Sequence, residues 1–349
     1  MESQTHSWVE EYYSKVLKTK ADLKTSACCA PSSMPEFLRP LLANIHEEVA
    51  SRFYGCGTPI PQAIEGASVL DLGCGTGRDC FILASLVGPS GKVVGIDMTD
   101  SQLEVAHKHR DYHAEKLNFQ SSQVEFKRGF IEDLRSAGIQ DNQFDLVISN
   151  CVINLSPQKE KVIAEIFRVL KPGGELYFSD VFSDRRLPQE LSQDPVLVGE
   201  CLGGALYVED FRRICEQFGF KDPRVIESSE IQLFDRRIRE QVSGVKFYSK
   251  TYRCFKLKLE DRCEDYGQVA YYQGSVSDSP DQFVLDDHHL FPKNYPVPIC
   301  GNTAAMLSKT RFKKHFKIVG DQSTHFGLFD CGPVLPMASG SESLNSGCC

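Results

Sequence analysis

A glycine-rich segment at residues 69–77 constrains the fold of this chain more than any other feature. It reads Val-Leu-Asp-Leu-Gly-Cys-Gly-Thr-Gly, with three glycines at alternate positions after the acidic Asp71. Such glycines let the backbone turn tightly and lie against a ligand, because they carry no Cβ. The apolar residues before the segment predict a strand, and residues 79–84 predict a helix after it. Strand, glycine loop and helix in this order are typical of a nucleotide-binding unit.

The spacing of the glycines narrows the choice of ligand. It is not G-x-G-x-x-G, so it fits a dinucleotide-binding fingerprint poorly. A glycine-rich turn that binds nothing is the alternative interpretation. Asp97 argues against that alternative, because it ends the next apolar strand about twenty residues after the loop. An acid at that place can accept hydrogen bonds from both hydroxyls of a ribose.

Strand-like and helical segments alternate beyond the loop. This alternation predicts βαβ units and a parallel sheet, so the expected fold class is α/β and doubly wound. A helix at 209–218 and two β-rich segments within 208–257 would complete the sheet with an antiparallel hairpin. We expect strands at residues 92–97, 124–129, 144–150 and 175–180, helices at 100–117 and 158–170, and a turn at 171–174.

The order of these elements, together with the Asp-x-Gly-x-Gly-x-Gly loop, resembles the class I S-adenosylmethionine-dependent methyltransferases over about residues 60–257. The resemblance implies a mostly parallel, seven-stranded, Rossmann-like sheet and S-adenosylmethionine as the cofactor. It implies that Asp97 binds the ribose and that Met98 lies on the adenine face. It also places Ile131 and Glu132 at the adenine edge. The other cofactor-binding residues that we expect are Tyr54, Asp71, Gly73, Gly75, Gly77 and Asn150.

Composition agrees with an enzyme of this kind. The chain has 349 residues, which exceeds one typical domain and predicts a core with additions. With 41% hydrophobic and 25% charged residues it can bury a proper core. The net charge is −8 without a basic run, so a nucleic-acid partner is not expected. The first residues do not resemble a signal peptide, and no apolar run approaches the ~18 residues of a membrane span. We therefore expect a cytoplasmic protein without a membrane partner.

Fourteen cysteines are unusual for a protein of a reducing compartment, where most should be free thiols. They do not form C-x-x-C pairs with zinc spacing, so a zinc site is not expected. Most are expected to be small apolar core residues, as Cys80 and Cys215 illustrate. Cys151 differs, because it follows Asn150 at the carboxyl end of the expected fourth strand, where ligands bind in open α/β sheets. Three interpretations of its thiol stay open: it is the acceptor, it is a ligand of the substrate, or its position there is a coincidence.

Three more cysteines have distinctive surroundings. Cys28 precedes a proline-containing loop, Cys56 lies between two glycines, and Cys201 precedes a glycine pair. Glycine-flanked positions pack poorly, so a core role explains Cys56 and Cys201 less well. We expect exposed, mobile loops that bring these thiols towards a ligand.

Four segments together resemble the arsenite methyltransferases, from about residue 10 to residue 257 and more weakly beyond. The resemblance implies that Cys56, Cys151 and Cys201 hold trivalent arsenic and that Cys28 takes part in redox chemistry or substrate capture. Cys29 follows Cys28, so the choice between these two thiols stays open, although the Thr-Ser-Ala-Cys context favours Cys28. The segments are Tyr-Gly-Cys-Gly at 54–57, Gly-Cys-Gly-Thr-Gly-Arg-Asp-Cys at 73–80, Asn-Cys-Val-Ile-Asn-Leu at 150–155 and Gly-Glu-Cys-Leu-Gly-Gly-Ala-Leu-Tyr at 199–207.

The implied function is methylation of arsenite to mono- and dimethylated arsenicals, in arsenic detoxification. Trivalent arsenic is soft and therefore suits thiolate ligands. The transfer formally oxidises arsenic, so a cysteine pair and a thiol reductant of the thioredoxin or glutathione type would return the electrons. Two alternatives remain open. One is a class I methyltransferase of a sterol, quinone or thiol, and the other is a non-catalytic arsenic-binding thiol protein.

We divide the chain into four parts and favour a monomer, with the oligomeric state left open. Residues 1–58 form a helical cap over the cofactor, with helices at 7–18 and 35–54. Residues 59–257 form the methyltransferase core, with an arsenic-binding insertion around 181–210. Residues 258–338 form a C-terminal domain of unassigned role, with His288 and His289 expected at the surface. Residues 339–349 form a disordered tail whose final thiols, Cys348 and Cys349, are expected to be solvated rather than functional.

Overall fold

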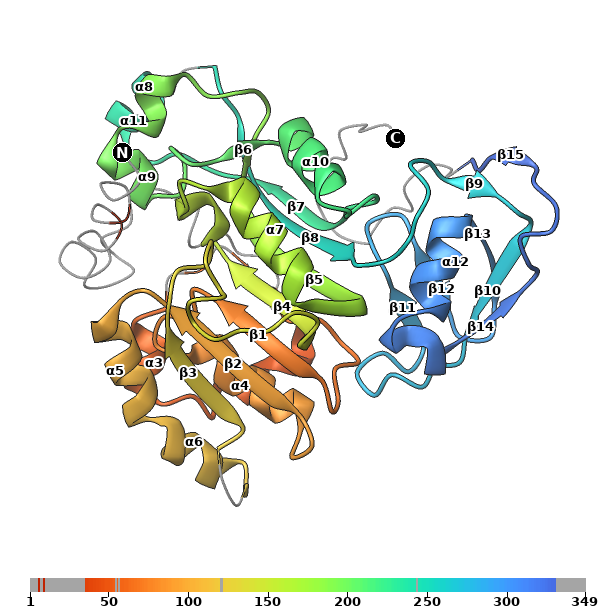
Figure 1. Ribbon diagram of the computed structural model, residues 1–349, viewed down its shortest axis with the longest axis horizontal. Helices are drawn as coiled ribbons and strands as arrows, with labels where there is room; N and C mark the ends of the chain where they lie inside the picture. The colour runs from red at the N-terminus through yellow and green to blue at the C-terminus, as the bar shows by residue number, and fades with distance from the viewer. Residues whose placement is uncertain are drawn as a thin grey trace.

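The computed structural model describes residues 6, 9, 35–53, 55, 57–119, 122–242 and 244–330. Two units lie side by side: an α/β unit with a central sheet, and a smaller β-rich unit drawn in blue next to strands β5 and β8 (Figure 1). Among the described residues, no helix has the length and apolarity needed to cross a membrane.

The central sheet has the strand order β3-β2-β1-β4-β5-β8-β7, and a two-residue strand, β6, pairs with β5. Strands β1 to β6 pair in parallel, whereas β8 runs antiparallel to both β5 and β7. The expected α/β sheet and its closing antiparallel hairpin are therefore confirmed. The strands are β1 (Ser68–Leu72), β2 (Lys92–Asp97), β3 (Val124–Arg128), β4 (Phe144–Asn150), β5 (Leu170–Ser183), β6 (Leu206–Tyr207), β7 (Arg224–Glu230) and β8 (Phe247–Phe255).

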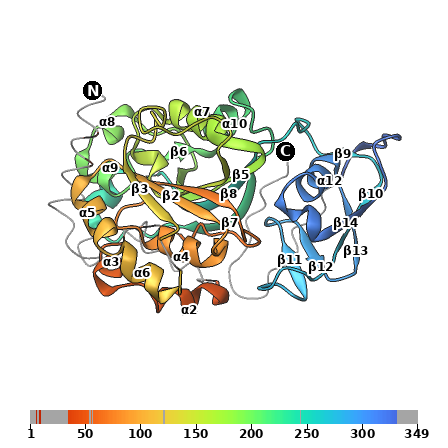
Figure 2. The same cartoon turned by 60° about the horizontal axis from the view of Figure 1, so that its bottom comes forward.

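Helices cover both faces of the sheet, with α7 and α10 on one side and α4 on the other (Figure 2). Two apolar clusters of buried residues lie on opposite sides of the sheet. The strands are buried on both faces for this reason, which is typical of parallel sheets. The helices of this unit are η3 (Glu36–Leu38), α2 (Arg39–Leu42), α3 (Glu47–Ser51), α4 (Arg78–Val87), α5 (Asp100–Lys108), α6 (Arg110–Lys116), η4 (Ile153–Leu155), α7 (Lys159–Val169), α8 (Gln189–Ser192), α9 (Pro195–Gly199), α10 (Val208–Gln217) and α11 (Arg236–Gln241).

Three expected boundaries are wrong. The helix predicted at 35–54 is broken into η3, α2 and α3, because His46 starts a new helix by accepting a hydrogen bond from the Glu48 amide at 3.2 Å. The helix predicted at 100–117 divides at His109, whose φ of −100° and ψ of 5° leave the helical region. The turn predicted at 171–174 belongs to β5, which begins at Leu170.

The smaller unit has its own apolar core, which includes Tyr272, Phe283, Phe291 and Phe312. Phe255 at the end of β8 belongs to the same cluster, so this core continues from the central sheet. The described part of this unit has three short sheets, and helix α12 packs against strands of two of them. Its elements are β9 (Glu264–Asp265), β10 (Gln268–Tyr272), β11 (Gln282–Val284), β12 (Leu290–Pro292), β13 (Pro296–Ile299), α12 (Gly301–Ser308), η5 (Arg311–Lys314), β14 (Phe316–Val319) and β15 (Gly327–Leu328).

Buried ion pairs join the two units. Glu175 of β5 is fully buried and pairs with Arg253 of β8 at 2.7 Å and with Arg311 of η5. His289 lies in the same junction and is 8% exposed, paired with Asp286 at 2.7 Å. The expectation of a surface position for His289 is therefore wrong, because a local carboxylate compensates its burial.

Candidate active site

The glycine loop connects β1 to α4, and each of its glycines has a left-handed φ: +68° at Gly73, +53° at Gly75 and +87° at Gly77. A Cβ on Gly73 would lie 2.5 Å from Val152, and one on Gly77 would lie 2.6 Å from Phe126. A Cβ on Gly75 would meet nothing within 4 Å. Two glycines therefore allow close packing, while the third exposes backbone to the adjoining pocket.

This pocket opens beside the loop at the carboxyl ends of β1, β2 and β4. Eight of the expected cofactor-binding residues line it: Asp71, Gly73, Gly75, Asp97, Met98, Ile131, Glu132 and Asn150. Gly77 instead forms the N-cap of α4. Tyr54 lies outside the described residues. The side chain of Gln102 also lines the pocket, and its buried Oε1 has no hydrogen-bond partner among the described residues. An unfilled acceptor suits a ligand that carries amino or hydroxyl groups.

Asp97 connects the loop to the end of β2. Its Oδ2 accepts the Gly75 amide hydrogen at 2.9 Å, and its Oδ1 accepts the Thr99 amide hydrogen at 2.9 Å. Burial raises the pKa of Asp97, and these backbone bonds oppose the rise. Each carboxylate oxygen has a further lone pair, so both can still accept a ribose hydroxyl.

A second acidic group, Asp79, lies near Asp71 in the same pocket. Asp79 pairs with Arg78 at 2.6 Å and accepts a hydrogen bond from Asn150 at 3.2 Å. Burial, together with the charge of Asp79, raises the pKa of Asp71 to about 8, and the Cys80 thiol donates to Asp71 at 3.2 Å. The sequence interpretation missed Asp79, although its place at the start of the helix after the loop was a usable signal.

Residues that follow β3 line another part of the pocket. Ile131 lines it next to Glu132, whose Oε1 lies 2.6 Å from His6 Nε2. The ring of His6 lies 4.8 Å from that of Phe130. His6 and Val9 are helical, and both line the pocket. Two residues of the expected N-terminal cap therefore line the pocket, and the cap itself stays a prediction.

Cys151 and Cys201 lie next to each other, and Cys151 is the one of the two that lines the pocket. Cys151 follows β4, lines the pocket and donates its amide hydrogen to Ser179 at 2.8 Å. The Cys201 sulfur lies 3.5 Å from the carbonyl oxygen of Cys151. Both have left-handed φ, +58° and +61°, which is uncommon for side chains with a Cβ and clusters at functional sites. Cys151 is in a disulfide bond whose partner lies outside the described residues, whereas Cys201 is not in a disulfide.

The expectation of an exposed loop around Cys201 is wrong, because the residue is fully buried among Leu197, Leu202 and Phe247. The adjoining glycines explain how it packs. A Cβ on Gly204 would lie 2.0 Å from the Asn154 carbonyl oxygen, and one on Gly203 would lie 2.8 Å from that of Leu191. The glycine pair therefore brings backbones together instead of exposing them.

Buried polar groups next to the two cysteines were also missed. Asp180 near the end of β5 accepts hydrogen bonds from the Asn154 amide at 3.1 Å and side chain at 2.8 Å. Burial raises the pKa of Asp180 to about 7. Burial lowers the pKa of Lys159 to about 8, against the charges of Asp180 and Cys201. Asp180 ends a predicted strand, so the rule on strand ends could have identified it.

Other cysteines divide into two groups. Cys80 and Cys215 are fully buried, as their apolar contexts predicted. The remaining cysteines that the sequence interpretation discussed lie outside the described residues and stay predictions: Cys28, Cys29, Cys56, Cys348 and Cys349.

The sheet order, the glycine loop and the pocket at the strand ends define a class I S-adenosylmethionine-dependent methyltransferase. The methyltransferase domain family model matches residues 64–219. The arsenite methyltransferase C-terminal domain family model matches residues 265–331.

Whole-chain comparisons specify the family further. An arsenite methyltransferase from Aquipseudomonas alcaligenes is 55% identical over 95% of this chain and 96% of its own length. The Homo sapiens arsenite methyltransferase is 43% identical over 96% of this chain and 87% of its own. The crystal structure of CrArsM, an arsenic(III) S-adenosylmethionine methyltransferase from Chlamydomonas reinhardtii, matches with a TM-score of 0.82 and 52% identity, over 85% of this chain and 99% of that one. The chain belongs to the arsenite methyltransferase family, whose activity is S-adenosylmethionine-dependent methylation of arsenic.

Proposed function

We propose that this chain methylates trivalent arsenic held by the thiolates of Cys151 and Cys201, with Cys56 as the third ligand. The observation that carries this assignment is the position of Cys151. It lines the cofactor pocket and also contacts Cys201 through its carbonyl oxygen at 3.5 Å. A substrate bound there would lie next to the place where the methyl donor binds.

The protein contributes chiefly by positioning. S-adenosylmethionine, when bound, supplies an electrophilic methyl group on its sulfonium, which the arsenic lone pair attacks. Asp97 and the loop at Gly75 would hold the ribose end of the cofactor, with Met98, Ile131 and Glu132 around the adenine. Asp71, Gly73, Gly77, Asn150 and Tyr54 complete the cofactor-binding set that we propose. Fixing donor and acceptor in a near-attack arrangement is worth up to about 7–11 kcal/mol.

Arsenic binding requires the thiols to lose protons. The charge of Lys159 acts on Cys201 and on Asp180. A nearby ammonium group favours a thiolate over a thiol. Asp180, with its pKa near 7, is suited to accept a proton when the arsenical arrives. We infer that these two residues assist binding at Cys201 without touching the methyl group.

The redox state of Cys151 supports a need for a reductant. In a disulfide, its sulfur has no thiolate to offer to arsenic. Two electrons and two protons from a thiol reductant, of the thioredoxin or glutathione type, would restore it. Cys28 is the thiol that we propose for this exchange, or for first capture of the substrate. We also propose that the enzyme works in the cytoplasm as a monomer.

The test is a methylation assay with arsenite, labelled S-adenosylmethionine and a thiol reductant. Cys151→Ser and Cys201→Ser should lose methylated arsenic while still binding the cofactor, because serine is a hard, weakly acidic ligand. Cys215→Ser is the control, since that thiol is buried in another cluster. Unchanged arsenite methylation in Cys201→Ser would overturn the ligand assignment.

The role of Cys28 is tested with two substrates. A monomethyl arsenical can use only two thiolates, so Cys28→Ser should lose arsenite methylation and keep part of the activity on trivalent monomethylarsenic. Cys151→Ser should lose both activities. Equal loss in Cys28→Ser, with an intact circular dichroism spectrum, would refute this division of roles.

A further inference from the structure

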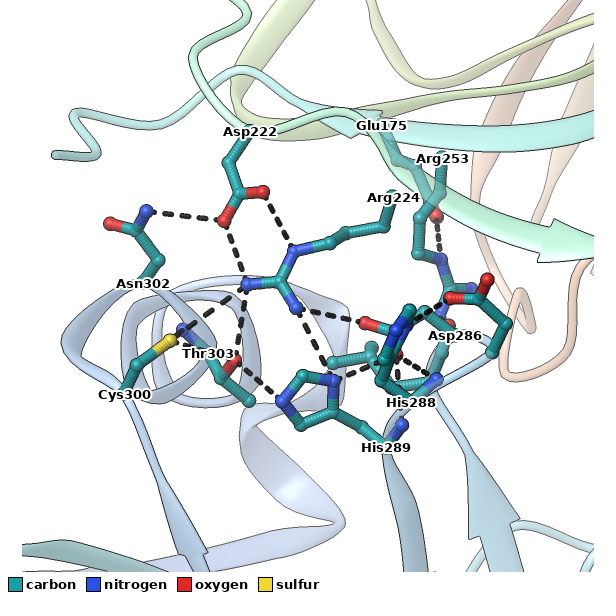
Figure 3. Close-up of polar contacts among 12 residues, drawn as sticks. Glu175, Asp222, Arg224, Arg253, Asp286, His288, His289, Cys300, Asn302 and Thr303 are labelled. Carbon is teal, nitrogen blue, oxygen red and sulfur yellow. Dashed lines mark hydrogen bonds and ion pairs between the residues drawn. The ribbon is translucent and has the colours of Figure 1, made fainter. Parts of the chain in front are cut away.

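A second group of reactive side chains lies at the junction between the central sheet and the smaller unit (Figure 3). Arg224 at the start of β7 is its centre. The guanidinium pairs with Asp222 at 2.7 Å and with Asp286 at 3.1 Å. Its Nη2 also lies 3.8 Å from the sulfur of Cys300. The Cys300 thiol therefore faces a buried cation. None of the proposed methylation steps uses this thiol or this cation.

Cys300 forms the N-cap of α12. Its sulfur accepts the Thr303 amide hydrogen at 3.4 Å and lies 3.2 Å from the Thr303 hydroxyl. A hydrogen bond from Cys263 lowers the pKa of Cys300 to about 5, burial opposes this, and the charge of Arg224 adds to it. The same contact raises the pKa of Cys263. The Arg224 guanidinium and the Thr303 amide both face the Cys300 sulfur, so Cys300 is the sulfur of the pair that these donors favour as a thiolate.

Backbone contacts fix Cys263 against the start of α12. Asn302, two residues after Cys300, donates to the carbonyl oxygens of Glu260 and Arg262 at 3.0 and 3.5 Å. Its own Oδ1 accepts the Glu260 amide hydrogen at 2.9 Å. Cys300 is fully buried, whereas Cys263 is only partly buried. The pair can thus be reached from the side of Cys263.

Another cysteine pair in the same chain provides a contrast. Cys215 and Cys254 also contact each other, but both are fully buried. Burial raises the pKa of Cys254, so that thiol stays protonated. Packing explains Cys215 and Cys254. It does not explain a thiolate that is paired with a guanidinium and has a partly exposed thiol beside it.

We propose that Cys263 and Cys300 form a second dithiol site, which binds a monosubstituted trivalent arsenical. Two As–S bonds form and two As–O bonds break. The two oxygens leave as water, with one proton from Cys263 and the others already on oxygen or from solvent. Arsenic remains trivalent, so no oxidant or reductant is needed. Thiolates are the preferred ligands of such a soft centre.

The number of sulfurs selects this class of ligand. A trivalent arsenical with two hydroxyl groups is neutral, so its binding adds no charge next to the buried ion pairs of Arg224. The monomethylated product of the proposed reaction has two exchangeable positions, which matches two sulfurs. A dimethylated species has one, so it cannot bridge the pair.

The test uses the full chain, reduced with a phosphine, and trivalent monomethylarsonous acid as the probe. Intact mass spectrometry under non-denaturing conditions gives the number of arsenicals bound, and the alkylation rate of Cys263 reports on the site itself. The probe should slow alkylation of Cys263 by about tenfold or more, because an arsenic-bound sulfur is no longer a nucleophile. A dimethylated trivalent arsenical at equal concentration should not give this protection.

Cys263→Ser should bind one arsenical fewer than the parent chain, and Cys254→Ser should bind the same number. Cys300→Ser should behave like Cys263→Ser if it folds. If it does not fold, the partly exposed Cys263→Ser and the alkylation rate in the parent chain decide the question. Equal stoichiometry in Cys263→Ser, or unprotected alkylation of Cys263, would overturn the proposal. Neither result would affect the assignment of Cys151 and Cys201.

Discussion

The sulfur of Cys201 lies 3.5 Å from the carbonyl oxygen of Cys151, although fifty residues separate the two in the chain. Cys151 follows β4, and Cys201 follows the short helix α9. Each has a left-handed φ, which turns the chain sharply at the residue that carries the thiol. Two strained turns therefore bring two sulfur-bearing residues together at the edge of the cofactor pocket.

The closeness of these turns depends on Gly204. Gly204→Ala would place a Cβ 2.0 Å from the Asn154 carbonyl oxygen, and neither backbone can yield easily. We expect the free energy of unfolding to fall by about 2 kcal/mol or more, with a larger loss of arsenite methylation than of cofactor binding. Denaturant titration and the methylation assay measure the two effects.

The control is Gly244→Ala. Gly244 has a φ of +81°, but a Cβ there would meet nothing within 4 Å. The strain of a left-handed alanine alone should cost about 1 kcal/mol. Equal losses of stability in the two variants would show that the contact with Asn154 is unimportant.

Asp97→Asn should weaken cofactor binding by about 1–3 kcal/mol, because charge-assisted hydrogen bonds are lost. The backbone amides of Gly75 and Thr99 each donate to one oxygen of the Asp97 carboxylate. The side-chain NH2 group of an asparagine would point its own hydrogens at one of these two donors. Calorimetric titration with S-adenosylhomocysteine measures the change. Asp111→Asn is the control, because this side chain is 85% exposed. An unchanged dissociation constant would exclude Asp97 from the binding site.

Glu175→Gln should destabilise the protein by about 3–5 kcal/mol, because it leaves Arg253 and Arg311 without their shared buried carboxylate. Denaturant unfolding measures the loss. Glu125→Gln removes an exposed partner of Lys92 and should cost less than about 1 kcal/mol. Similar effects of the two substitutions would mean that the buried ion pairs do not hold the two units together.

The pH dependence of stability should include a contribution from His113. Burial lowers its pKa from 6.5 to about 4. Its Nε2 accepts the His46 amide hydrogen at 3.2 Å, and its Nδ1 donates to the His109 carbonyl at 2.7 Å. As the pH falls below 6.5, His113 therefore binds a proton in the unfolded chain but not yet in the folded one. The free energy of unfolding decreases for this reason until about pH 4, where the folded chain also binds the proton.

His113→Gln should make this decrease smaller between pH 6.5 and pH 4, as measured by urea unfolding at several pH values. His325→Gln is the control, because that side chain is 51% exposed. A slope that stays the same in His113→Gln would contradict the assignment of the acid sensitivity to this residue.

The local chemistry of the site was readable in the sequence. The loop at 71–77, the acid at Asp97 and the thiol at Cys151 each occupy a place that strand–helix alternation determines, so eight expected residues indeed line one pocket. Periodicity also predicted the core positions of Cys80 and Cys215, since apolar neighbours at helical spacing indicate burial.

Tertiary structure alone decided how distant segments meet. The glycines beside Cys201 read as an exposed loop, yet they allow two backbones to touch and bury the thiol. The same holds for Arg224, whose partners Asp286 and Cys300 come from a unit far along the chain. A sequence specifies local propensity and periodicity, whereas the environment of a thiol or a histidine depends on the charges that folding brings next to it. That is why the sequence determined the class and cofactor loop of this protein, and only the fold could show which buried groups act on its cysteines.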